Sequence, residues 1–205
     1  MLSAIIATHE SERTLVPTLS ALVPAVAAGL LGEVVVADAG SSDATAEVAE
    51  IAGCRFISSG EPLGVRLKSA AQQTRAPWLM FLRAGVVPEP GWIPAAERFM
   101  QAADLAEAAE RAAVFRRQSA ADLMRPGVTE LVAMLRAAFG GGPQPEQGLL
   151  IARRFYEALG GHEGHSDAEA ALLRKLGRRR IAMLSCGGNR VAIIPSVIPG
   201  HARSA

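Results

Sequence analysis

The sequence is poor in several residue types, and each shortage excludes a class of protein. Aromatic residues make up only 4% of the 205 residues, so an aromatic platform for stacking single-stranded nucleic acid is not expected. The formal net charge of +1 provides no strongly basic surface for phosphate backbones. The two cysteines, Cys54 and Cys186, are far apart and match no metal or redox spacing. We therefore predict a reduced, intracellular protein that binds no nucleic acid.

Long uninterrupted apolar runs are also lacking. The longest, "ALVPAVAAGLLGEVVVADA", contains Pro24, Gly29, Gly32 and Glu33, and its pattern changes from helical to strand-like after Gly32. It predicts a helix, a turn and a strand rather than a membrane span. The opening "MLSAIIATHE" lacks the basic start and the small-residue cleavage site of a signal peptide. We expect a cytoplasmic protein, and peripheral contact with the inner face of the membrane stays open.

Apolar residues, half of the total, follow alternating strand and helix patterns. In the first half we expect strands at 2–7, 33–40, 55–59 and 78–82, and helices at 12–28, 41–53 and 66–74. In the second half we expect helices at 94–109, 128–139, 153–161 and 167–176, and strands at 111–117, 147–152, 178–184 and 190–195. Alternation at these spacings is typical of βαβ crossovers. The sequence therefore predicts an α/β fold, a three-layer α/β/α sandwich with a mainly parallel, doubly wound sheet, in one domain.

The strand at 33–40 ends in a turn suited to a ligand. Asp38 stands at the carboxyl end of this strand, where a carboxylate can accept paired hydrogen bonds from an imide N–H or from ribose hydroxyls. Gly40 lets the backbone approach a ligand closely, and Ser41 or Asp43 can cap the next helix. A plain βα turn with a helix cap explains the same residues, so both interpretations stay open.

Four stretches together resemble the family 2 glycosyltransferases of the GT-A fold, the nucleotide-diphospho-sugar transferase type, and in particular its short bacterial members. They are "AIIATHESERTL", "VVVADAGSSDAT", "WLMFLRAG" and "QGLLIARRFYEALGGHEGHSDAEAALLRKLG". The resemblance runs from Ser3 to about Ile194 and implies a single domain, 1–205, with a nucleotide-binding half, 1–93, and an acceptor-side half, 94–205. Members transfer a sugar from a nucleoside diphosphate sugar to an acceptor, usually with inversion at the anomeric carbon. The acceptor and the oligomeric state stay unknown.

The resemblance also implies roles for individual residues. On the donor side these are Ala7, Thr8, Glu10, Asp38, Gly40 and Ser41. On the acceptor side they are Gln147 and Gly148, with Asp167 as the catalytic base that takes the acceptor hydroxyl's proton. Asp167 also stands at a helix start, where capping alone would account for it.

The family's metal-binding signature, two acidic residues flanking one other, corresponds to positions 83–85. Here those positions are Arg83, Ala84 and Gly85. Neither Arg83 nor Gly85 supplies the oxygen ligands that Mg²⁺ or Mn²⁺ prefers, so we expect no divalent metal cofactor. A guanidinium can instead form a paired contact with phosphate oxygens. Arg83, joined by Arg66 and Lys68 from the third helix, could take over part of a metal's electrostatic role.

The same departures favour an alternative, a catalytically inactive GT-A-fold binding or scaffold protein. Family members frequently carry an asparagine and a glycine in the third helix, where this chain has Lys68 and Ala70. A nucleotidyltransferase is disfavoured, because the first βα connection lacks a glycine-rich, lysine-containing phosphate loop.

Two further clusters have several interpretations. His162, His165, Asp167 and Glu169 suggest zinc, but their spacing is not that of a helical zinc pair, and Gly164 makes the segment a loop. We expect His162 and His165 to line the acceptor side or to be solvated. The basic run "RKLGRRR" could contact anionic lipid or a phosphorylated acceptor, or be a solvated helix end.

Overall fold

The computed structural model describes residues 1–105, 110–117, 147–165 and 167–190. Within these residues one eight-stranded sheet has the order β3-β2-β1-β4-β7-β6-β8-β5. The strands are β1 (Leu2–Thr8), β2 (Leu31–Asp38), β3 (Arg55–Ser58), β4 (Trp78–Arg83), β5 (Val86–Pro88), β6 (Ala112–Arg117), β7 (Leu149–Ala152) and β8 (Ile181–Arg190). The helices are α1 (Glu12–Ala27), α2 (Thr45–Ile51), α3 (Leu63–Gln72), α4 (Trp92–Leu105), α6 (Arg153–Ala158) and α7 (Ala168–Leu176).

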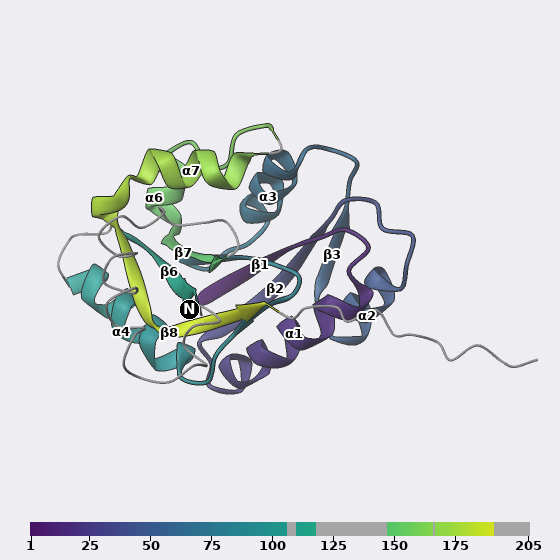
Figure 1. Ribbon diagram of the computed structural model, residues 1–205, viewed down its shortest axis with the longest axis horizontal. Coiled ribbons are helices and arrows are strands. Elements are labelled where there is room, and N and C mark those ends of the chain that lie inside the picture. Colours follow the sequence, from purple (N-terminus) through teal and green to yellow (C-terminus); the bar gives the residue numbers. More distant parts are fainter. Residues whose placement is uncertain (106–109, 118–146, 166, 191–205) are drawn as a thin grey trace, which may run out of the picture.

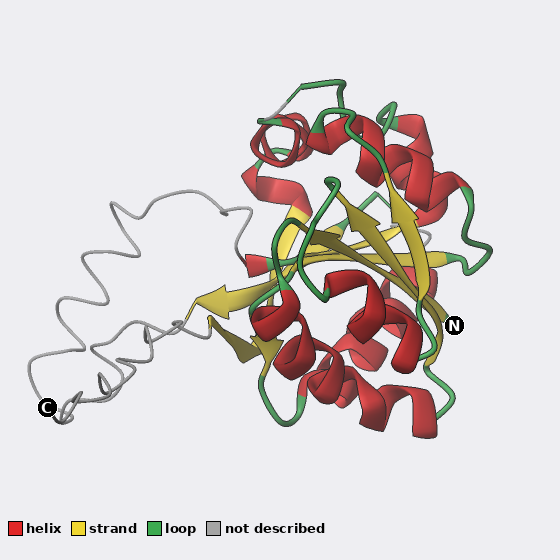
Figure 2. Ribbon diagram, turned by 90° about the vertical axis from the view of Figure 1, so that its right-hand side faces the viewer, coloured by secondary structure: helices red, strands yellow, loops and turns green. Residues whose placement is uncertain are grey.

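The sheet is mainly parallel and covered by helices on both faces. Strands β3, β2, β1 and β4 run parallel, β7 runs antiparallel to β4 and β6, and β6 pairs in parallel with β8. Figure 1 shows α1, α2 and α4 on one face and α3, α6 and α7 on the other, and Figure 2 shows the sheet between the two layers. The predicted three-layer α/β fold is confirmed.

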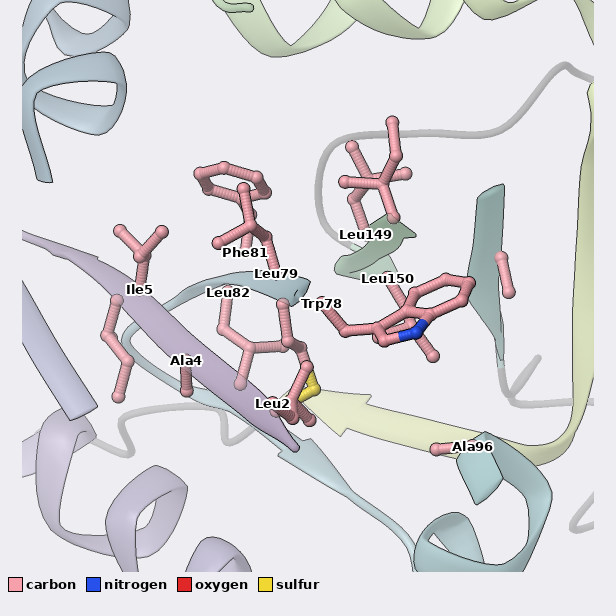
Figure 3. Packing of buried hydrophobic residues seen from close by; sticks show 14 of the residues in the cluster. Leu2, Ala4, Ile5, Trp78, Leu79, Phe81, Leu82, Ala96, Leu149 and Leu150 are labelled. Carbon is pink, nitrogen blue, oxygen red and sulfur yellow. The ribbon is translucent and has the colours of Figure 1, made fainter. Parts of the chain in front are cut away.

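The central strands are mostly apolar along their length, because helices cover both of their faces. All seven residues of β1 are buried, and Leu2, Ile5, Leu79 and Leu82 pack together in the core (Figure 3). Alternate residues of β4 face opposite layers: the Trp78 ring lies 5.7 Å from that of Phe99 in α4, and the Phe81 ring lies 5.0 Å from that of Tyr156 in α6. Arg83, two residues beyond Phe81, therefore belongs to the face of α3, α6 and α7.

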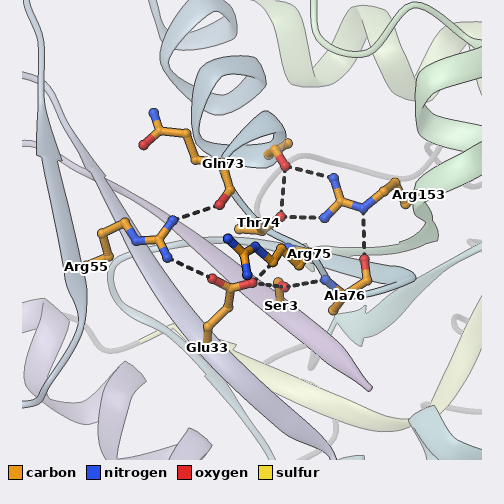
Figure 4. A network of polar contacts seen from close by, with 9 residues as sticks. Ser3, Glu33, Arg55, Gln73, Thr74, Arg75, Ala76 and Arg153 are labelled. Atoms are coloured by element: carbon orange, nitrogen blue, oxygen red, sulfur yellow. Dashed lines mark hydrogen bonds and ion pairs between the residues drawn. The ribbon is translucent and has the colours of Figure 1, made fainter.

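A polar network ties the amino ends of the strands together (Figure 4). The Glu33 carboxylate accepts a hydrogen bond of 2.8 Å from Ser3 Oγ and pairs with Arg55 Nη2 at 3.4 Å. Arg153 donates from Nη1 to the Ala71 carbonyl at 2.8 Å and from Nη2 to Thr74 Oγ1 at 2.6 Å. These contacts satisfy the carboxyl end of α3 and fix the start of β4.

One carboxylate serves the first turns of two helices. Asp43 Oδ2 accepts from the Glu12 N–H at 3.0 Å, and Asp43 Oδ1 accepts from the Thr45 N–H at 3.0 Å. Glu12 begins α1 and Thr45 begins α2. Asp43, one of the two residues that the sequence offered as a cap, thus binds the first N–H groups of both helices, although Ala44 occupies the N-cap position of α2. The Ser41 side chain bonds instead to Asp38, so the helix starts at Thr45 and not at residue 41.

The structure differs from the predicted elements at several positions. The short strand β5 was not expected. Residues Arg178–Arg180 form a 3₁₀ turn, so the predicted strand start at 178 is wrong, because the strand begins only where apolar Ile181 pairs with Ala112 of β6. β8 then continues to Arg190 as one strand. The helix predicted at 128–139 and the strand residues 191–195 lie outside the described residues.

None of the helices in the described part of the chain is both long and apolar enough to span a bilayer.

Candidate functional site

The carboxyl ends of β2, β1 and β4 lie side by side at one edge of the sheet. Thr8 pairs in register with Asp38 of β2, and Ala7 pairs with Arg83 of β4. Asp38 and Arg83 are therefore at the same edge, one on each side of β1. In open α/β sheets this is the edge at which ligands bind.

Asp38 is fully buried, and its carboxylate is occupied by protein groups. Oδ1 accepts from Thr8 Oγ1 at 2.8 Å and from Ser41 Oγ at 2.5 Å. Oδ2 accepts from the N–H groups of Gly40 at 2.8 Å and Ser41 at 2.7 Å, and from Ser58 Oγ at 3.2 Å. Burial acts to raise the pKa of Asp38, but the hydrogen bonds outweigh it and the pKa is lowered. The carboxylate thus shapes the turn at Gly40, whose φ is 82°.

Glu10 joins this turn to the end of β1. Its Oε1 accepts from the Ser42 N–H at 2.7 Å, and its own N–H donates to Ser41 Oγ at 2.8 Å. Glu10 is the non-glycine residue with a positive φ in the described chain, at 48°. Such strained backbone recurs at functional sites. Hydrogen bonds therefore join the turns after β1 and β2 into one exposed polar surface.

Arg66 reaches from α3 to the ends of β1 and β2. Its Nη1 donates to the Ala37 carbonyl at 2.5 Å and approaches the Thr8 carbonyl at 3.5 Å, and its Nε donates to the Glu61 carbonyl at 3.1 Å. Burial lowers the pKa of Arg66, and nearby Asp38 opposes that shift. The guanidinium thus contacts the carbonyl groups at the ends of both strands.

Lys68 is not part of this cluster. It lies on the outer face of α3 and lines a groove of about 410 Å³ between α3 and the segment 160–164, together with Gln72, His162 and Glu163. The structure therefore separates Lys68 from Arg66 and Arg83.

Arg83 is held by a carboxylate from α7. Its Nε donates to Glu169 Oε2 at 2.7 Å, and its Nη2 contacts the same oxygen. The side chain of Glu169 is only 9% exposed, whereas that of Arg83 is 39% exposed. Sequence reasoning considered Glu169 only as a member of a possible zinc cluster. A cation at the end of an apolar strand requires a counter-charge, but which of the acidic residues supplies it depends on the topology.

Asp167 immediately precedes α7 and is exposed. Its Oδ2 pairs with Arg174 Nη2 at 3.1 Å, and its side chain makes no capping hydrogen bond to the helix. His165 lies nearby and pairs through Nε2 with Glu163 at 2.9 Å. Both residues thus lie on the surface of the segment that leads into α7.

Gln147 and Gly148, predicted on the acceptor side, precede β7. Gln147 Nε2 donates to the Phe115 carbonyl at 2.8 Å. Gly148 has a φ of 69°, and a Cβ there would come within 2.7 Å of Leu82 Cδ2. The glycine is therefore required by packing against β4 and β6.

The segment before α7 is anchored by a buried pair. Tyr156 Oη and His162 Nδ1 are 2.9 Å apart, and the His162 ring lies edge-on to Phe81 at 4.7 Å. Burial lowers the pKa of His162 to about 4 and raises that of Tyr156 to about 12. His162 is therefore neutral at neutral pH and buried, which corrects the expectation of a solvated histidine. Its place on the acceptor side stays a prediction.

The residues at the end of β4 do not fit a divalent metal. Arg83 and Gly85 provide no oxygen side chain, and the carboxylate that does approach, Glu169, is paired with Arg83. Across the described residues, no group of three or more His, Cys, Asp or Glu side chains is arranged to hold a metal ion.

Comparison with known proteins adds a sequence match and a set of similar folds. Residues 3–121 match the model of glycosyl transferase family 2. No curated protein sequence matches the chain. The fold is similar to that of glucosyl-3-phosphoglycerate synthase from Mycobacterium tuberculosis in complex with Mn²⁺, UDP and glucosyl-3-phosphoglycerate, with a TM-score of 0.66 and 20% identity over 94% of this chain and 72% of that one.

Other solved structures agree in fold. The same synthase with Mn²⁺, UDP-glucose and phosphoglyceric acid gives a TM-score of 0.63 and 21% identity over 89% of this chain and 68% of that one. A further mycobacterial protein gives 0.66 and 22% identity over 94% of this chain and 67% of that one. At these identities the similarity establishes the shared fold.

Proposed function

Because this chain belongs to glycosyltransferase family 2, whose model covers more than half of it, we propose that it transfers a sugar from a nucleoside diphosphate sugar to an acceptor, with inversion and without a metal ion. The observation that carries the proposal is the position of Arg83. Its partly exposed guanidinium lies at the ligand-binding edge of the sheet, one strand away from the turn that Asp38 shapes. A cation there suits a diphosphate.

The nucleoside half of the donor would lie against the turns after β1 and β2, within the nucleotide-binding half, 1–93. Since Asp38 is buried and its oxygens are occupied, we assign it the role of holding the turn. Ligand contacts then fall to the exposed surface of the turn, at Glu10, Gly40 and Ser41. Ala7 and Thr8, which are buried, would form the floor beneath the nucleoside.

The diphosphate would lie between Arg66 and Arg83. Guanidinium groups bind phosphate oxygens in pairs, and they stabilise the negative charge that the departing nucleoside diphosphate gains. Lys68 lies apart in the groove along α3, so its contribution would be limited to long-range attraction.

The acceptor would approach from the side of α7, in the half 94–205. Asp167 is proposed as the base that removes the acceptor hydroxyl's proton as the oxygen attacks the anomeric carbon. Its carboxylate is exposed and paired only at the surface with Arg174, so it is accessible to a substrate. His165, Gln147 and Gly148 remain proposals for the acceptor side.

The side chains at the end of β4 support metal independence. The synthase structures contain Mn²⁺ or Mg²⁺ with UDP. This chain instead has Arg83 and Gly85 at the positions that correspond to the family's acidic metal-binding signature. We therefore propose that the cationic side chains, rather than a metal, neutralise the leaving group.

One observation favours a second candidate, a non-catalytic binding or scaffold protein of the same fold. Arg66 already bonds to the Ala37 carbonyl, and Arg83 already pairs with Glu169. The protein's own groups thus already occupy some of the N–H donors that a nucleotide would need. In this alternative a protein partner, rather than a nucleotide, uses the surface.

The test is a titration of the protein with UDP and with UDP-glucose, in EDTA and again with Mn²⁺, followed by calorimetry and thermal unfolding. A transferase of the proposed type binds UDP in EDTA, and binding raises its melting temperature. Slow release of UDP from the sugar nucleotide in EDTA would further support it. Binding that requires Mn²⁺ contradicts metal independence, and absence of any nucleotide binding supports the scaffold alternative.

A further inference from the structure

Building on the proposed function, we propose that Glu169 is a positioning residue for Arg83. Its carboxylate binds one edge of the guanidinium, so that the other edge faces the place of the donor's diphosphate. Glu169 itself touches neither the nucleotide nor the sugar.

The hydrogen bonds of Arg83 divide its guanidinium into two edges. Nε and Nη2 both donate to Oε2 of Glu169. In the described part of the chain, Nη1 has no hydrogen-bond acceptor, which leaves its N–H groups and the outer N–H of Nη2 available. Two N–H groups on neighbouring nitrogens form the fork that binds phosphate oxygens in a paired contact. The edge that remains is therefore the phosphate-binding edge.

The burial of the two partners is unequal in the way a positioning role requires. The Glu169 side chain is 9% exposed and that of Arg83 is 39% exposed. A buried carboxylate needs its cation, because leaving it unpaired is costly. An incoming phosphate therefore contacts the exposed part of the guanidinium. The buried carboxylate of Glu169 stays bound to Nε and Nη2.

The carboxylate is itself rigidly supported. Glu169 lies in the first turn of α7, and the preceding Ala168 packs so closely on α3 that a Cβ at Gly64 would come within 2.6 Å of Ala168 Cβ. The segment before it is anchored by the buried contact of Tyr156 with His162. A guanidinium held from such a support loses little freedom when it binds a ligand.

The contact of Glu169 with Arg83 takes the place of a carboxylate-bound metal ion. In a metal-dependent site, a carboxylate holds a cation and the cation holds the diphosphate. Here α7 supplies the carboxylate and β4 supplies the cation. Arg83 exchanges no atoms in the transfer: the acceptor oxygen bonds to the anomeric carbon, the bond to the phosphate oxygen breaks with its electron pair, and the hydroxyl proton passes to the base.

The experiment measures the affinity for UDP and for UMP, in EDTA, by calorimetry. The variants are Glu169→Gln, Arg83→Met and the double variant. We expect Glu169→Gln to weaken UDP binding about tenfold, and to leave UMP binding unchanged, because UMP lacks the second phosphate. In the Arg83→Met background, Glu169→Gln should have no further effect, since the residue acts only through Arg83.

Two controls separate positioning from a structural role. Glu33→Gln removes a carboxylate that also pairs with an arginine, Arg55, but at the amino end of the sheet. It should leave both affinities unchanged. Glu169→Asp keeps the charge with a shorter reach, and should give a UDP affinity between those of the wild type and Glu169→Gln, which keeps the test informative if Glu169→Gln unfolds.

Several outcomes would overturn the inference. They are unchanged or tighter UDP binding by Glu169→Gln, an equal loss for UMP, or an equal loss in the Arg83→Met background. These results leave the proposed function intact if the wild type binds UDP. A wild type that binds no nucleoside diphosphate, whichever its base, overturns the proposed function, and the positioning role falls with it.

Discussion

Gly64 of α3 lies directly against the carbonyl oxygen of Glu163, so closely that a Cβ built on Gly64 would come within 1.5 Å of that oxygen. This contact joins the start of α3 to the segment that leads into α7. It sets the distance between the helix that carries Arg66 and the helix that carries Glu169.

Gly64→Ala should therefore destabilise the protein. The added methyl group forces α3 and the segment 160–165 apart, and overpacking of this kind costs about 3 kcal/mol. Urea unfolding would measure the loss. Gly60→Ala is the matched control, because nothing lies within 4 Å of its added Cβ. Equal stabilities for the two variants would show that the contact yields without cost.

Asp38→Asn should also destabilise the fold, by about 3 kcal/mol. An amide has one acceptor oxygen and an NH₂ group, so it cannot accept all the hydrogen bonds that reach the carboxylate from Thr8, Gly40, Ser41 and Ser58. The turn that Gly40 occupies would then lose its anchor. Chemical unfolding of the variant beside the wild type measures the difference, and Asp104→Asn, at an exposed position of α4, serves as the control.

The pKa of Asp38 adds a pH dependence. Because this pKa is lowered in the folded state, the carboxylate contributes stability above its unfolded pKa and loses that contribution as the pH falls through the folded pKa. The wild type should therefore lose stability more steeply than Asp38→Asn below about pH 4. Parallel acid unfolding curves for the two proteins would contradict the role of the charge.

His162 governs a different pH range. Its pKa falls from 6.5 to about 4 in the folded state, so the unfolded chain binds a proton at a higher pH than the folded chain does. Stability should therefore decrease as the pH falls from 6.5 towards 4, by about 3 kcal/mol at most. Unfolding at three pH values in this range measures the slope.

His162→Phe should flatten the dependence of stability on pH, because a phenyl ring cannot take up a proton. The variant is less stable at pH 7, because Tyr156 Oη loses its partner at His162 Nδ1. The test is the slope and not the absolute stability. A slope that persists in the variant would assign the pH dependence to other groups.

Asp167→Asn should abolish sugar transfer and leave UDP binding unchanged. The side chain is 65% exposed, so its replacement should alter stability by less than about 0.5 kcal/mol. Turnover is measured as UDP released in the presence of an acceptor, and binding is measured by calorimetry. Arg174→Met, which removes only the surface partner, is expected to keep turnover; unchanged turnover in Asp167→Asn would remove this residue from the mechanism.

Sequence reasoning succeeded where the determinants are local. The β-branched run at Val34–Val36 and the apolar run at Trp78–Leu82 predicted buried parallel strands, and the order of elements predicted that Asp38 and Arg83 reach one edge of the sheet. Both predictions are confirmed by the register of β1 with β2 and β4.

The partners of these residues could not be predicted, because they come from distant parts of the chain. Ser58 lies twenty residues from Asp38, and Glu169 lies 86 residues from Arg83. The short strand β5 escaped prediction because three residues carry too little periodicity. Helix α3 begins at Leu63, after Pro62, and not at Arg66 as predicted. The start was missed because a proline before a helix is a weaker signal than a polar cap.

Asp43 couples the local unfolding of α1 to that of α2. It accepts hydrogen bonds from the first N–H groups of both α1 and α2, so neither helix can fray at that end without releasing the anion it shares with the other. The amide protons of Glu12 and Thr45 should exchange with solvent in a single cooperative event, with one common opening free energy. The two helix starts that border the β1 and β2 turns thus behave as one unit of local unfolding.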